Sequence, residues 1–186
     1  MRVLLTSAGL ETDEIKEHFM DMLDKDMSLV KALFIPTAAI DAGAIGVLPK
    51  CMNDLLKCGI LNQNIKVYDL HAGMDAGELQ QYDVVYLCGG NTQYLLERIN
   101  DTGFNKSLDE FIHNNGMVIG VSAGSLIFAN NLQNNLGLID TRLGVHCAAG
   151  EKRGKLAYPL KDNVKLTNTC ALAIRNLSDG MEIIGE

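Results

Sequence analysis

Positive charge is scarce in this sequence. Lys and Arg number 16 against 23 Asp and Glu, which gives a formal net charge of −7. A domain that binds duplex nucleic acid usually shows the opposite balance, because contacts with phosphates supply its affinity. The densest basic stretch, "EKRGK" at 151–155, is expected to be a solvated loop. The charge balance therefore argues against nucleic acid as a partner.

Long apolar runs are also missing. Every run is well under the roughly 18 residues that a membrane-spanning helix needs. The first one, in "MRVLLTSAG", is too short for a signal peptide and predicts a buried strand. Apolar residues make up 47% and charged residues 21% of the 186 residues, as in ordinary globular proteins. We expect a cytoplasmic protein with no membrane partner, folded as a single domain over residues 1–186.

Paired cysteines are the third absence. The cysteines are five, an odd number, and none is spaced C-x-x-C: Cys51, Cys58, Cys88, Cys147 and Cys170. This pattern indicates neither a disulfide framework nor a zinc site. Free, mostly buried thiols in a reducing compartment are expected instead.

The chain does contain a regular alternation of apolar and amphipathic segments. Strands that are apolar throughout, separated by helices, indicate a parallel sheet covered on both faces. We predict a three-layer α/β fold, Rossmann-like and flavodoxin-like, with short strands in "VKLT", "CALAIR" and "MEIIGE" forming a small antiparallel extension. The expected strands are 2–6, 31–39, 65–70, 82–91 and 117–121. The expected helices are 10–25, 50–59 (starting after Pro49 and capped by Gly59), 92–100 and 105–114.

One strand end with possible chemistry is "YLCGGNT", where Gly89 and Gly90 precede Asn91. Adjacent glycines allow backbone amides to approach a bound group closely. The same residues also fit a tight strand-to-helix turn in which Asn91 or Thr92 is the helix N-cap. Both interpretations remain open from this motif alone.

A second strand end reads Gly120-Val121-Ser122-Ala123-Gly124, which fits G-x-S-x-G. In that motif the serine sits on a sharp strand-to-helix turn, and flanking glycines avoid a steric clash. The amide of Ala123 would then point to where an oxyanion forms. The alternative is that Ser122 only caps a helix.

A serine nucleophile needs a base, and the chain has four histidines. His18 and His113 are expected to face solvent, whereas His71 follows a strand and could reach the carboxyl edge of the sheet. His146 lies 24 residues beyond Ser122, at the end of a short apolar stretch. The order nucleophile, histidine, then a C-terminal orienting group differs from that of α/β-hydrolases, in which histidine comes last.

These motifs together resemble a known family. "YLCGGNT", followed about 30 residues later by "IGVSAGS" in a Rossmann-like frame, is similar to peptidase E and its relatives in peptidase family S51, which include aspartyl dipeptidase and cyanophycinase. That family belongs to the class I glutamine amidotransferase-like superfamily, with serine in place of cysteine. The resemblance extends over nearly the whole chain.

The resemblance implies a serine hydrolase that cleaves a small peptide or amide without a metal or cofactor. Ser122 matches the nucleophile and His146 the base, while Gly90 and Ala123 match the oxyanion-hole region. It implies nothing about oligomeric state, and the family's preference for an N-terminal aspartate does not transfer, because the interval between Ser122 and His146 is short. That shortening implies a smaller substrate pocket.

Besides the short interval between Ser122 and His146, two features depart from the family pattern. Val145 and Cys147 flank His146 where proline and an aromatic residue are common, and Asn168 occupies the place of the orienting acid. An amide can orient histidine but cannot stabilise the imidazolium as a carboxylate does. Asp140 and Glu151 are possible substitutes, and Asn168 also fits a plain turn between strands.

Three other functions compete with the hydrolase. A non-catalytic relative would bind a small molecule or a protein partner, and an unremarkable backbone at Ser122 would favour it. A nucleotide-binding protein of this fold would carry the motif G-x-G-x-x-G after its first strand, and this sequence lacks the motif there. Cys88 as a nucleophile is disfavoured, because it sits at an apolar strand end where burial is expected.

Overall fold

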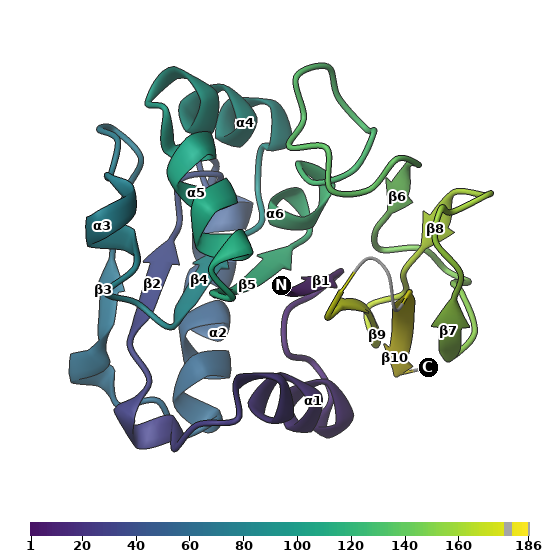
Figure 1. The fold of residues 1–186 in the computed structure, drawn as a ribbon, viewed down its shortest axis with the longest axis horizontal. Coiled ribbons are helices and arrows are strands. Elements are labelled where there is room, and N and C mark those ends of the chain that lie inside the picture. Colours follow the sequence, from purple (N-terminus) through teal and green to yellow (C-terminus); the bar gives the residue numbers. More distant parts are fainter. Residues whose placement is uncertain (177–179, 186) are drawn as a thin grey trace.

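A computed structural model describes residues 1–176 and 180–185. These residues form an eight-stranded sheet in the order β3-β2-β4-β5-β1-β9-β10-β7 (Figure 1). The first five strands in that order are parallel, and the last three run antiparallel to their neighbours. The strands are β1 (Arg2–Thr6), β2 (Ala32–Ile35), β3 (Ile65–Val67), β4 (Val84–Leu87), β5 (Met117–Val121), β7 (Gly154–Leu156), β9 (Cys170–Ile174) and β10 (Met181–Gly185).

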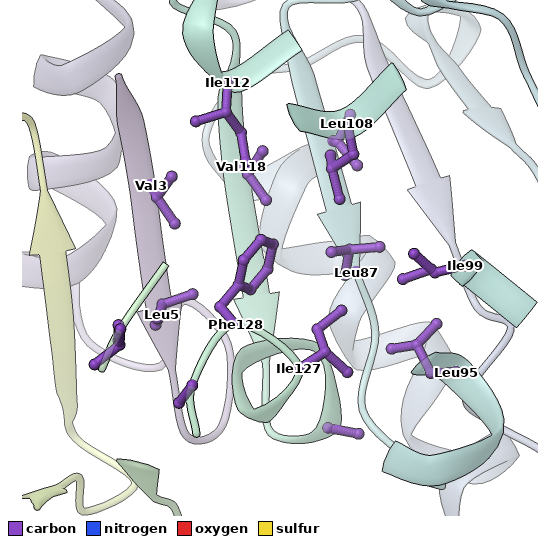
Figure 2. Close-up of a cluster of buried hydrophobic side chains, with 14 of the residues drawn as sticks. Val3, Leu5, Leu87, Leu95, Ile99, Leu108, Ile112, Val118, Ile127 and Phe128 are labelled. Carbon is purple, nitrogen blue, oxygen red and sulfur yellow. The ribbon is translucent and has the colours of Figure 1, made fainter. Parts of the chain in front are cut away.

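Helices cover both faces of this sheet. Phe19 and Leu55 belong to α1 and α2 and pack with Tyr86 on one face. Leu95, Phe111 and other apolar residues of α3, α4 and α5 form the core of the other face, part of which is shown in Figure 2. The predicted three-layer α/β fold is therefore confirmed. The helices are α1 (Asp13–Leu23), α2 (Ala42–Lys57), α3 (Ala76–Leu79), α4 (Thr92–Asp101), α5 (Phe104–His113) and α6 (Ala123–Leu126), with 3-10 turns at Met27–Leu29 and Asn62–Asn64.

Helix α2 begins earlier than predicted. The sequence analysis started it after Pro49, but the helix starts at Ala42, and the side chain of Asp41 caps it by accepting the Ala44 N–H at 3.0 Å. Pro49 lies inside the helix on an exposed surface, where water can satisfy the carbonyl that proline leaves without a donor. The predicted cap at Gly59 is confirmed, since its φ is +95° just after the helix ends.

The antiparallel extension is confirmed, but its membership differs from the prediction. The strand in "VKLT" is β8 (Val164–Lys165), and it pairs in parallel with β6 (Leu143–Gly144) in a separate two-stranded sheet. The third strand of the extension is β7, so the basic stretch at 151–155 is only partly a loop. These additions lie beside β10 in Figure 1.

None of the helices within residues 1–176 and 180–185 combines the length and hydrophobicity needed to cross a membrane.

Candidate active site

Ser122 occupies the sharp turn between β5 and α6. Its backbone has φ +49° and ψ −107°, which is outside the regions that non-glycine residues ordinarily adopt. Such a conformation costs on the order of 1–3 kcal/mol and persists only where the surrounding structure enforces it. The Ser122 side chain makes no capping hydrogen bond, so the interpretation as a simple helix cap fails.

The two glycines of the motif are required by close packing. A Cβ on Gly120 would lie 2.5 Å from the carbonyl oxygen of Gly124, and one on Gly124 would lie 2.3 Å from that of Leu87. Both distances are far inside van der Waals contact, so any side chain would displace the backbone. The predicted steric reason for the flanking glycines is confirmed.

Ser125 fixes the same turn to the neighbouring strand. Its Oγ donates to the Thr6 carbonyl at 2.8 Å and accepts the Thr6 N–H at 3.0 Å, and both residues are fully buried. The Ser122 N–H also donates to the Thr6 carbonyl, at 3.0 Å. The end of β1 therefore anchors the strained turn.

His146 and Asn168 complete a chain of hydrogen bonds that starts at Ser122. Nε2 of His146 lies 3.0 Å from Ser122 Oγ, and Nδ1 lies 2.7 Å from Asn168 Oδ1. Because an amide oxygen only accepts, Nδ1 carries the proton when this bond forms. Nε2 is then free to accept the proton of the Ser122 hydroxyl.

The pairing of β6 with β8 brings His146 and Asn168 together. Leu166 donates its N–H to the Gly144 carbonyl at 2.8 Å and accepts the Cys147 N–H at 3.0 Å. These bonds hold the segments around 146 and 168 side by side. His146 itself has φ +55°, which turns the chain at the edge of the site.

Ser7 also contacts this pair, and the sequence analysis missed it. Its fully buried hydroxyl accepts the backbone N–H of His146 and donates to Asn168 Oδ1 at 3.3 Å, with His146 Nδ1 3.4 Å away. Ser7 directly follows β1. Its place at the carboxyl end of a central strand, where such sheets bind ligands, is the signal that could have identified it.

The Gly-Gly-Asn turn lies against Ser122. A Cβ on Gly89 would be 3.2 Å from Ser122 Cβ, and one on Gly90 would be 2.0 Å from the Ala38 carbonyl oxygen. Asn91 accepts the Tyr94 N–H at 2.9 Å, so the N-cap interpretation of this residue is confirmed.

Two backbone amides near Ser122 are not used in hydrogen bonds within the described protein. Within the described part of the chain, the N–H groups of Gly90 and Ala123 donate to no protein acceptor. These are the two positions that the sequence analysis assigned to an oxyanion hole. Their side-by-side placement with Ser122 makes that chemistry possible.

The other candidate bases and acids lie elsewhere. His71 pairs with Asp69 at 2.8 Å and does not line the pocket at Ser122. Among the described residues, neither Asp140 nor Glu151 hydrogen-bonds to His146.

The predictions for the remaining histidines and for Cys88 have mixed outcomes. His113 is exposed, as predicted. The prediction for His18 was wrong: it is half-buried, its Nε2 has no partner among the described residues, and burial lowers its pKa. Cys88 is fully buried as expected, and burial raises the pKa of its thiol.

A pocket of about 230 Å³ opens at Ser122 and His146. Its wall combines the ends of β1 and β4 with one side of α2, and its lining residues are Ser7, Ala8, Ala44, Val47, Leu48, Lys50, Cys51, Gly89, Gly90, Val121, Ser122 and His146. A larger hollow of about 570 Å³, beside α5 and residues 134–138, contains none of the candidate catalytic residues. No three His, Cys, Asp or Glu residues within 1–176 and 180–185 are grouped to hold a metal.

Curated relatives match part of the chain. An uncharacterized peptidase of Listeria monocytogenes is 30% identical over 99 residues, which are 53% of this chain and 48% of the relative. An uncharacterized peptidase of Pasteurella multocida is 28% identical over the same length, again 48% of the relative. The aligned region therefore spans about half the length of these relatives.

Solved structures share the fold over the full chain. A peptidase E-like protein of Listeria monocytogenes superimposes with a TM-score of 0.75 at 22% identity, covering 100% of this chain and 98% of the other. A peptidase from an acI-B1 actinobacterium gives a TM-score of 0.70 at 16% identity, covering 100% and 87%.

The model of peptidase family S51 matches residues 3–141. The match contains the Gly-Gly-Asn turn and the Ser122 elbow and ends before His146 and Asn168. With the glycines, the strained serine and the sheet order described above, it identifies this chain as a member of peptidase family S51.

Proposed function

We propose that the protein is a serine-type peptidase that hydrolyses a small peptide or a related amide. The observation that carries this proposal is the distance of 3.0 Å between Ser122 Oγ and His146 Nε2, at a serine held in a strained turn. A base within hydrogen-bonding reach of a hydroxyl is the arrangement that nucleophilic catalysis requires.

The reaction begins with attack of Ser122 Oγ on the substrate carbonyl carbon while Nε2 of His146 takes the hydroxyl proton. The carbonyl oxygen becomes an oxyanion and accepts the N–H groups of Gly90 and Ala123. The C–N bond then breaks as Nε2 returns the proton to the leaving amine. A water, deprotonated by His146, hydrolyses the acyl-enzyme and regenerates Ser122.

Asn168 orients the imidazole in this scheme. Its Oδ1 accepts the Nδ1 proton at 2.7 Å, which selects the tautomer that leaves Nε2 unprotonated. The neutral amide does not stabilise the imidazolium electrostatically, so we expect a slower enzyme than one with a carboxylate at this position. The small pocket favours a short substrate.

A fluorophosphonate probe tests the proposal directly. Such a probe should form an adduct at Ser122 of the folded protein, located by mass spectrometry of peptides. Ser122→Ala and His146→Ala should lose the adduct, whereas His113→Ala, which changes an exposed histidine outside the pocket, should keep it. Absence of an adduct in folded wild-type protein would refute the proposal and favour a binding role without catalysis.

A further inference from the structure

The pocket beside Ser122 has an apolar wall, and its composition bears on the choice of substrate. Resting on the function proposed above, we propose that this pocket binds an uncharged apolar side chain of the acyl residue. The preferred substrates are then small peptides or amides that release an apolar amino acid, such as alanine or leucine, from the acyl side of the cleaved bond.

Helix α2 supplies more of the lining residues than any other element. Ala44, Val47, Leu48 and Cys51 line the pocket from positions spaced three, one and three residues apart, which places them along one side of the helix. Val47 is 50% exposed although it is a large apolar residue. A bound apolar side chain would cover this surface and remove it from water.

Among the described residues, Lys50 is the only Lys, Arg, Asp or Glu that lines the pocket, and its charge already has a partner. Its Nζ lies 2.6 Å from Glu11 Oε2 and donates to the Ala8 carbonyl at 3.0 Å. Burial alone would lower the pKa of Lys50, but the bond to Glu11 and the nearby Asp54 carboxyl raise it overall. The ammonium already has a carboxylate partner, so a substrate carboxylate would have to compete with Glu11 for it.

The pocket also disfavours a substrate with a basic side chain. No Asp or Glu lines the pocket among the described residues, so a lysine or arginine side chain would enter without a counter-ion. Removing a charge from water without a partner is costly. Both charged classes are therefore disfavoured relative to an apolar side chain.

The apolar wall faces the part of the substrate that carries the reacting carbonyl group. Gly90, whose amide is proposed to hold the carbonyl oxygen, lines the same pocket as the side chains of α2. The acyl residue carries that carbonyl, so its side chain is the substituent attached nearest to this wall. The volume of about 230 Å³ equals roughly eight water molecules, enough for a leucine side chain.

The test is a panel of aminoacyl p-nitroanilides with glycine, alanine, leucine, aspartate and lysine as the acyl residue. Each buried methylene should raise kcat/KM about fourfold. Because the pocket is open, we expect leucine to exceed glycine at least tenfold and to exceed aspartate and lysine by more. Val47→Ser should lower kcat/KM for leucine about fivefold to tenfold and reduce the ratio of leucine to glycine by a similar factor.

Ile45→Ser is the matched control. Ile45 lies on the same helix and is 52% exposed, but it does not line the pocket, so this variant should keep the wild-type ranking. Diphenyl phosphonate analogues of leucine and aspartate should inactivate the enzyme in the same order. The rates of inactivation report the preference for the acyl residue without requiring substrate turnover.

Three results would overturn the inference. They are equal rates across the panel, a preference for aspartate or lysine, and a leucine preference that Val47→Ser does not change. In each of these cases, an adduct of the fluorophosphonate probe at Ser122 would show that the proposed hydrolytic function stands. Loss of both the adduct and all hydrolysis would instead refute the function itself, and the specificity with it.

Discussion

Under the proposed chemistry, replacing Asn168 by aspartate should accelerate hydrolysis. Asn168 Oδ1 lies 2.7 Å from His146 Nδ1, so Asn168→Asp places a carboxylate of nearly the same shape against the imidazolium that forms during attack. Two unit charges about 4 Å apart attract by about 1 kcal/mol in water and about 4 kcal/mol at an effective dielectric constant of 20. Both side chains are exposed, so we take the lower part of this range, about 1–2 kcal/mol.

That stabilisation corresponds to an increase in kcat of about 5- to 30-fold. Added salt should reduce the gain, because exposed charges are screened. The assay is steady-state hydrolysis of leucine p-nitroanilide between pH 5 and pH 10, at low and high salt.

Asn168→Ala is the companion variant and should lower kcat, since it removes the acceptor that selects the tautomer. If Asn168→Asp folds normally but does not increase kcat at any pH, Asn168 does not act through His146 and the reasoning fails.

Three further predictions concern other residues. Ser125→Ala removes the acceptor of the buried Thr6 N–H and should lower the free energy of unfolding by about 1–3 kcal/mol in urea titrations; a loss below 0.5 kcal/mol would contradict this. Ser7→Ala should lower kcat about tenfold with KM nearly unchanged, because the His146 segment loses its buried acceptor; an unaltered kcat would show that Ser7 is not a positioning residue. Burial lowers the pKa of His18 below its ordinary value of 6.5. The unfolded chain therefore binds a proton that the folded chain does not, and the free energy of unfolding falls as pH drops from 6.5 towards the folded-state pKa. His18→Gln should remove this part of the dependence of unfolding free energy on pH between pH 7.5 and pH 5. Identical pH dependences in the variant and the wild type would refute the assignment.

The parallel core and the elbow could be predicted from sequence because their causes are local. Apolar strands that alternate with amphipathic helices predict a parallel sheet covered on both faces. The motif G-x-S-x-G needs glycines because a side chain would clash in the turn, and the contacts of Gly120 and Gly124 confirm this. Pro49 wrongly predicts the start of helix α2, because proline is common at the first positions of helices but here lies inside one. The capping side chain of Asp41 was the stronger signal.

The remainder of the candidate site depends on contacts between distant segments. Ser7 is 139 residues from His146 in the sequence, so its place after β1 indicates the edge of the sheet but not the hydrogen bond to His146. The position of Asn168 depends on the short parallel pair β6–β8, and two-residue strands carry no hydrophobic period. Family resemblance indicated His146 and Asn168, but only the pairing of these strands explains why they meet.

The sheet order also determines when the site can form during synthesis. The turn at Ser122 needs strands β1, β4 and β5 and the anchoring side chain of Ser125, all of which have been synthesised by residue 125. Asn168 lies two residues before β9, and β9 pairs with β1, which lies near the other end of the sequence. The orienting group is therefore the last part of the site to be synthesised. Under the proposed chemistry, a growing chain carries a serine without its oriented base until β9 has emerged from the ribosome. The nascent protein is therefore expected to be inert towards other chains emerging nearby.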